Sequence, residues 1–99
     1  MNETEIKYFA EIIKENGYVT EYQDSRFHKI FDSREDHKKN YNALNKYCEE
    51  NYGFEIAAAS YNVKKDGYST IVFRLDAEFA YDNIELTKIL DEEYENLRN

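Results

Sequence analysis

The chain has 99 residues, a formal net charge of −8 at pH 7, 41% hydrophobic and 16% aromatic residues, and one cysteine. This length accommodates one hydrophobic core but no active site enclosed between two lobes, so we expect a single domain spanning residues 1–99. The negative charge disfavours direct binding to nucleic acid or anionic membranes and favours a basic protein partner, although many soluble proteins are acidic for solubility alone.

The sequence shows no sign of secretion or membrane insertion. Cys48 is the only cysteine and cannot form an internal disulfide. No positively charged leader followed by an apolar run opens the chain, and no apolar run approaches the roughly 18 to 20 residues that cross a bilayer. We therefore expect a cytoplasmic protein without a membrane role.

The segment from Asn2 to Gly17 is expected to form an amphipathic helix. Asn2 followed by Glu5 is a capping-box pattern, and Gly17 supplies a stop signal. Helical spacing gives this segment an apolar face, which consists of Ile6, Phe9, Ala10 and Ile13. The opposite face is acidic with one aromatic ring, and it consists of Tyr8, Glu11 and Glu15. This face is either a solvated surface or a contact surface.

A short hairpin and a long helix are expected next. Segments 18–24 and 26–31 are rich in β-forming residues on either side of a turn-prone Asp-Ser pair, which indicates a hairpin. The following helix is expected to span 33–52 and to end before Gly53. Its buried stripe follows the helical period and consists of His37, Tyr41, Leu44, Cys48 and Tyr52.

A second hairpin is the clearest local signal in the sequence. Segments 54–63 and 68–75 are rich in β-forming residues, and Asp66 followed by Gly67 between them is a hairpin-turn pattern. In the second of these strands one face is strongly apolar and the other is mixed. We therefore expect one face of the sheet to pack under helices.

The last quarter of the chain carries most of the negative charge. Residues 76–99 hold eight acidic and two basic residues, a charge of −6, while residues 1–24 carry −4. A capping-box pattern at Asp82 and Glu85 predicts that the final helix begins there. Glu93 falls within the apolar arc of this helix, so we expect it either to reach solvent or to meet a basic partner such as a sheet arginine. The apolar arc consists of Leu86, Ile89, Leu90, Tyr94 and Leu97, and the outward residues are Glu85, Asp91, Glu92 and Glu95.

Together these elements predict an α+β fold. We expect a small two-layer sandwich with the element order αββαββα, in which an antiparallel sheet of about four strands is covered by helices.

No residue pattern indicates catalysis or metal binding. His37 and Cys48 share a helical face, but eleven residues of helix would separate them by about 16 Å. Paired cysteines, an HExxH arrangement and a glycine-rich phosphate loop are all missing from the sequence. Basic and aromatic residues alternate weakly between 25 and 75, where the net charge is +2, and pairing with the acidic segments explains this charge better than nucleic-acid binding. We expect a protein that is not an enzyme and that uses no cofactor or metal.

The first and last helices suggest an acidic inhibitor. If they lie side by side on one sheet face, their outer carboxylates form a negative strip that can occupy the nucleic-acid-binding surface of a nuclease or other DNA-binding protein. In composition the chain is similar to small phage and mobile-element inhibitors, including DNA-mimic and anti-CRISPR proteins. The expected contact residues are Tyr8, Glu11, Glu15, Glu85, Asp91, Glu92, Tyr94 and Glu95.

Two alternatives stay open. One is a structural or regulatory interaction module that acts through an aromatic or apolar patch, or as a homodimer through a sheet edge. The other is an enzyme with a closed pocket around His28, His37 or Cys48. Ionic strength separates an acidic strip from an apolar patch, because salt weakens association through exposed charges much more.

Overall fold

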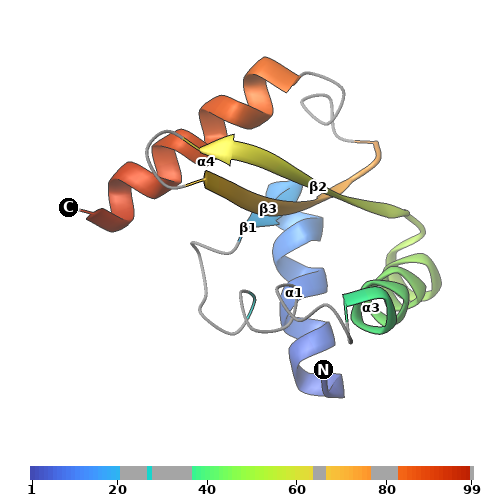
Figure 1. Cartoon of the computed structure of the whole chain (residues 1–99). Coiled ribbons are helices and arrows are strands. Elements are labelled where there is room, and N and C mark those ends of the chain that lie inside the picture. Colours follow the sequence, from blue (N-terminus) through green and yellow to red (C-terminus); the bar gives the residue numbers. More distant parts are fainter. Residues whose placement is uncertain (21–26, 28–36, 64–66, 77–82, 99) are drawn as a thin grey trace.

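A computed structural model of the chain describes residues 1–20, 27, 37–63, 67–76 and 83–98 (Figure 1). The elements in chain order are α1 (Glu3–Asn16), β1 (Tyr18–Thr20), α3 (His37–Tyr52), β2 (Ile56–Val63), β3 (Gly67–Arg74) and α4 (Asn83–Arg98). The three predicted helices and the second hairpin are therefore present. Of the predicted strand 26–31 only Phe27 is described, and at this residue the prediction is wrong because Phe27 is helical and buried.

The described strands form one antiparallel sheet in the order β1-β3-β2. The central strand β3 pairs with both neighbours, and Val72 lies opposite Val19 on one side and Ala58 on the other. The α+β class is confirmed. The predicted count of about four strands is not confirmed, since three strands are present among the described residues.

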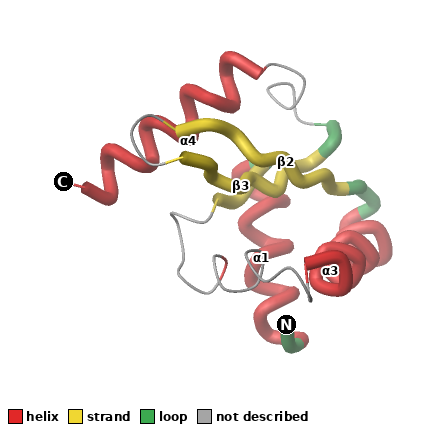
Figure 2. The backbone as a smooth tube through the Cα atoms, in the orientation of Figure 1, coloured by secondary structure: helices red, strands yellow, loops and turns green. Residues whose placement is uncertain are grey.

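Helices lie on both faces of this sheet (Figure 2). One hydrophobic core joins α1 and α3 to the sheet, and its buried members are Phe9, Ala10, Ile13, Val19, Phe27, Leu44, Cys48, Phe54, Ile56 and Val72. A second core joins α4 to the opposite face, and its buried members are Ile71, Phe73, Leu86 and Leu90. The predicted two-layer sandwich is not confirmed, because the sheet lies between α4 and the pair formed by α1 and α3.

The burial of β3 explains this arrangement. Ile71, Val72 and Phe73 are consecutive, and all three are buried. Successive side chains of a strand point to opposite faces, so a run of buried residues requires cover on both sides. Val72, which interrupts the alternation of apolar and polar residues in this strand, is therefore a core residue on the face covered by α1 and α3.

The ends of α1 agree with the sequence patterns. The side chain of Asn2 accepts a hydrogen bond from the backbone of Glu5 at 2.8 Å, and the Glu5 carboxylate accepts one from the backbone of Asn2 at 3.0 Å. Gly17 follows the helix with φ 90°, and its N–H donates to Ile13 at 2.8 Å. Gly53 follows α3 with φ 76°, a conformation in which glycine carries little steric cost. These capping and stop predictions are confirmed, while the predicted starts at Ser33 and Asp82 lie outside the described residues.

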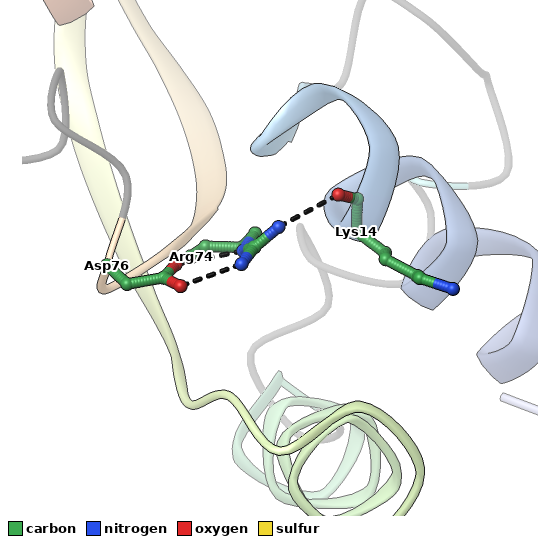
Figure 3. A network of polar contacts seen from close by, with 3 residues as sticks. All are labelled: Lys14, Arg74 and Asp76. Atoms are coloured by element: carbon green, nitrogen blue, oxygen red, sulfur yellow. Dashed lines mark hydrogen bonds and ion pairs between the residues drawn. The ribbon is translucent and has the colours of Figure 1, made fainter.

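Arg74 ties β3 to the end of α1 (Figure 3). Its guanidinium donates two hydrogen bonds to the Asp76 carboxylate, at 2.8 and 2.7 Å, and one to the backbone oxygen of Lys14 at 2.9 Å. It also lies over the ring of Phe54, at 4.6 Å from the centroid. The bond to Lys14 satisfies one of the carbonyls that the end of a helix leaves without an intrahelical partner. The hydrogen bond from Arg74 holds the pKa of the Asp76 carboxyl below its ordinary value.

We expect Arg74→Ala to lower the free energy of unfolding by about 2 kcal/mol, since it removes a charged hydrogen bond and a cation–π contact. For a domain of this size each kcal/mol corresponds to about 4–8 °C in Tm, which thermal denaturation measures. Asp76→Asn serves as the control, because Asp76 is exposed and its ion pair is screened by solvent. An equal loss in both variants would show that the surface ion pair, and not the contact with α1, provides the stability.

Candidate functional site

The outer side of α4 carries a group of carboxylates. Leu86 and Leu90 are fully buried against the sheet, which fixes the opposite side of the helix toward solvent. On that side Glu92 and Glu95 are exposed and Asp91 is half-buried. Together with Asn96 they line an open hollow of about 350 Å³. We call Asp91, Glu92 and Glu95 the α4 acidic face.

The two other predicted contact residues of α4 differ from this group. Tyr94 is half-buried and packs against the second core, so its ring mainly supports the helix. Glu85 belongs to the first turn of α4, and its side chain lies outside the described set. Lys88 is exposed on the outer side of the helix and reduces the local negative charge by one.

The predicted contact residues of α1 form a separate surface. Glu11 and Glu15 are exposed, and Tyr8 is 40% exposed with its ring edge against Phe9, at 5.3 Å between centroids. Positions 8, 11 and 15 lie on one side of the helix, as the sequence predicts. Lys14, on the same helix, places its ammonium 4.7 Å from the centroid of the Tyr52 ring on α3.

The structure does not bring the α1 and α4 acidic residues together. The helices α1 and α4 lie on opposite faces of the sheet (Figure 1), and each packs into a different hydrophobic core. The condition for a joint strip, that the first and last helices lie side by side on one sheet face, is therefore not met. A continuous strip across the two helices is excluded for this reason, and among the described residues the carboxylates of α1 and α4 lie on two separate faces.

Glu93 lies on the inner side of α4, below the acidic face. The hydroxyl of Thr20 in β1 donates a hydrogen bond to the Glu93 carboxylate, and Thr20 itself is fully buried. Burial raises the pKa of Glu93, and the bond from Thr20 offsets part of this effect. The nearby Tyr18 hydroxyl also has a raised pKa, first because of burial and then because of the negative charges of Glu93 and Glu92. Solvent or a basic partner was expected for Glu93. Among the residues that the structure describes it has no basic partner, and its half-buried carboxylate accepts a hydrogen bond from a threonine hydroxyl instead.

The raised pKa of Glu93 makes its contribution to stability depend on pH. The folded state favours the protonated carboxyl, so the stability from this group is fully present below the ordinary value of about 4.3 and is lost as the pH rises through the raised value. We expect Glu93→Gln to stabilise the protein at pH 7 by roughly 1 kcal/mol, because the neutral amide still accepts the bond from Thr20. Urea denaturation at neutral and acidic pH measures this change.

The advantage of Glu93→Gln is expected to shrink at acidic pH, where the natural carboxyl is itself protonated. Glu92→Gln provides the matched control, since it removes the same charge from an exposed position on the same helix. Equal stabilisation by the two variants would show that the net charge of the chain, and not the burial of Glu93, sets the effect.

Of the candidates for chemistry, Cys48 is a core residue, His37 is half-buried at the start of α3, and His28 lies outside the described residues. Cys48 is buried in the first core, and burial raises the pKa of its thiol to about 11, so the thiol is protonated at neutral pH. Within the described parts of the chain there is no group of three or more His, Cys, Asp or Glu side chains that could hold a metal ion. No helix in those parts is long and apolar enough to cross a membrane.

A second hollow lies between α1 and α3, with a volume of about 450 Å³. Its lining combines apolar residues with two acidic and two basic residues, so its charges balance. Its lining consists of Glu3, Ile6, Lys7, Ala43, Lys46, Tyr47 and Glu50.

Sequence reasoning missed two features of the site. The hydrogen bond between Thr20 and Glu93 could be predicted only in part. The position of Glu93 in the apolar arc indicated an unusual environment, but it did not indicate the partner. Asn96, which borders the α4 acidic face, gave no signal because a single polar residue near a helix end is ordinary. Comparison of the chain with protein-family models, curated proteins and solved structures found no significant match.

Proposed function

We propose that the chain is an acidic inhibitor that binds a basic protein and occupies its nucleic-acid-binding surface through the α4 acidic face. The observation that carries this proposal is the position of Asp91, Glu92 and Glu95 on the outer side of a helix whose inner side is fixed to the sheet by Leu86 and Leu90. Their charge is thus held on a packed scaffold. Fixed charges of one sign favour a partner of the opposite sign and accelerate the encounter with it.

The spacing of these carboxylates is compatible with a surface that mimics the phosphates of DNA. Residues four apart in a helix are about 6 Å apart along its axis, which separates Asp91 from Glu95. Phosphates along one DNA strand are about 3.4 Å apart in axial rise, so this distance matches roughly two phosphate steps. Arginine side chains that bind phosphates also bind carboxylates in a two-pronged geometry. A nuclease or another DNA-binding protein therefore has the chemistry to bind this face.

The contact proposed here is smaller than the one expected from the sequence. A partner that covers α4 does not reach Tyr8, Glu11 and Glu15, since these residues lie in the layer on the other side of the sheet. The contact consists of the α4 acidic face, with Glu85 as a further acidic residue of the same helix. The compositional similarity to phage and mobile-element inhibitors, including anti-CRISPR proteins, supports the same function in the cytoplasm.

The test uses the full chain as an immobilised bait. We expect a basic DNA-binding protein from the native host to bind at low salt, to elute along a salt gradient and to be displaced by short duplex DNA. Displacement by DNA is the informative part, because it shows that the two ligands share one surface. Retention of the partner in the presence of saturating DNA would contradict the proposal.

A second candidate function, an interaction module that pairs through a sheet edge, is favoured by one observation. Within the described sheet, β2 lies at the end of the order β1-β3-β2 and has one strand neighbour. This edge is long, with eight residues, whereas β1 at the other end has three. Association through backbone hydrogen bonds at such an edge would depend little on salt, in contrast to binding by the α4 acidic face.

A further inference from the structure

The outer edge of β2 can be assigned residue by residue from its hydrogen bonds. The N–H of Leu75 donates to the oxygen of Glu55 at 3.1 Å, so this antiparallel pair is of the hydrogen-bonded kind. Hydrogen-bonded and non-hydrogen-bonded pairs alternate along an antiparallel ladder. In the register of β2 and β3, odd-numbered residues of β2 therefore bond to β3. The backbone groups that point away from β3 belong to Ile56, Ala58, Ser60 and Asn62.

At Ile56, the first residue of β2, the structure confirms this assignment, and side chains there already bond the outward backbone groups. The backbone N–H of Ile56 donates to the side chain of Asn45 at 2.9 Å, and the oxygen of Ile56 accepts from the hydroxyl of Tyr41 at 2.6 Å. Both partners belong to α3, which therefore covers the first outward residue of the strand. Within the part of the chain that the structure describes, the open edge begins at Ala58 and ends at Asn62.

The open edge lacks the usual protection against strand pairing. Natural edge strands carry charged residues or proline that discourage a further strand. The strand Ile56–Val63 has the sequence IAAASYNV, without a charge or a proline. Ser60 in its middle is exposed, and Ala58 is half-buried. An uncharged strand of eight residues is unusual in a chain of which 34% of the residues are charged.

We propose that the open edge of β2 pairs with the same edge of a second copy of this chain. The absence of charge favours a second copy. Two molecules that each carry −8 repel each other elsewhere, but along this strand no like charges face each other. The closure at Ile56 fixes the register. An antiparallel pairing that uses all three open residues places Ser60 opposite Ser60 and Ala58 opposite Asn62. About six backbone hydrogen bonds would form, two for each of three pairs.

The dimer would place both α4 helices on one side. Residues opposite each other in an antiparallel pair have their side chains on the same face of the sheet, so the continuous sheet keeps its two faces. The helix α4 packs against the face to which Ala57 and Ala59 contribute, so each copy holds α4 beside the shared edge. The two α4 acidic faces would form one larger negative surface. This consequence for partner binding depends on the proposed function, whereas the dimer itself does not.

Salt should act on the dimer and on partner binding with opposite signs. Salt screens the repulsion between two acidic molecules, so it leaves the dimer unchanged or strengthens it. Salt weakens the attraction between the α4 acidic face and a basic partner.

The first test measures the mass of the full chain in solution by sedimentation over a range of concentration and salt. We expect a dimer whose dissociation constant does not rise with salt. Ser60→Lys places like charges opposite each other and is expected to raise that constant at least tenfold. Asn42→Lys, at an exposed position on α3, adds the same charge and should leave the constant unchanged. A monomer at all concentrations, or equal weakening by both variants, would overturn the proposal.

The second test fixes the register and does not depend on the folding of the lysine variant. Paired residues of this kind have Cα atoms about 5.5 Å apart, within the range that a disulfide bridges. Ser60→Cys should therefore form a covalent dimer under mild oxidation, while Asn42→Cys should not. Failure of Ser60→Cys to cross-link would overturn the register. Loss of binding to the basic partner with an intact dimer would count against the proposed function alone, so the two failures can be told apart.

Discussion

Reversing Glu92 and Glu95 to lysine together is expected to weaken binding to the basic partner at least a hundredfold at low salt. Each substitution replaces an attraction with a repulsion, and like charges across an interface cost several kcal/mol in total. About 2.8 kcal/mol corresponds to a hundredfold change in Kd. Both side chains are exposed on α4, so the fold should be unaffected. Titration of the purified partner at two salt concentrations measures the loss.

The matched control reverses Glu11 and Glu15, which are also exposed but lie on α1. This variant changes the net charge of the chain by the same amount and alters a surface in the layer beyond the sheet. We expect its affinity to fall only a few fold, through weaker long-range attraction. If the two double variants lose affinity equally, the total charge of the chain determines binding and the α4 acidic face has no special role.

The parts of the fold that depend on near neighbours in the sequence were predictable. The capping box at Asn2 and Glu5 and the stop at Gly17 are interactions within a few residues, so the residue types alone specify them. The burial of Leu86 and Leu90 and the exposure of Glu92 and Glu95 follow from the helical period in the same way. This is why the division of α4 into a packed side and an acidic side was correct.

The parts that depend on distant contacts were not predictable. Periodicity shows that a helix has an apolar side, but it does not show which face of a sheet that side covers. The sequence signal for helices on both faces was Val72, because an apolar residue between Ile71 and Phe73 makes β3 apolar on both faces. All three residues are buried in the structure. The pairing of Thr20 with Glu93 joins residues far apart in the sequence, and no local pattern specifies such a pair.

The attachment of α4 to the sheet is expected to depend strongly on Leu90. This side chain is fully buried in the second core, where the other buried members are Ile71, Phe73 and Leu86. Leu90→Ala should lower the free energy of unfolding by about 2–5 kcal/mol through lost burial and the cavity that remains. A domain of this size has a typical total of roughly 5–15 kcal/mol, so the loss is a large part of the stability. The midpoint of urea denaturation measures it.

Ile89→Ala is the matched control for Leu90→Ala, because Ile89 is half-buried on the same helix and loses a side chain of similar size. Its cost should be clearly smaller, and equal costs would show that full burial of Leu90 in the second core contributes no more to the attachment of α4 than a half-buried side chain does. The two variants also separate the effect of helix stability on partner binding from the effect of the charged contact itself. Neither changes a charge, so the salt dependence of partner binding should stay that of the natural chain in both, while Leu90→Ala lowers the apparent affinity by the fraction of molecules that are unfolded. A change in the salt dependence itself would mean that the packing of α4 sets the positions of the carboxylates as well as the stability of the helix.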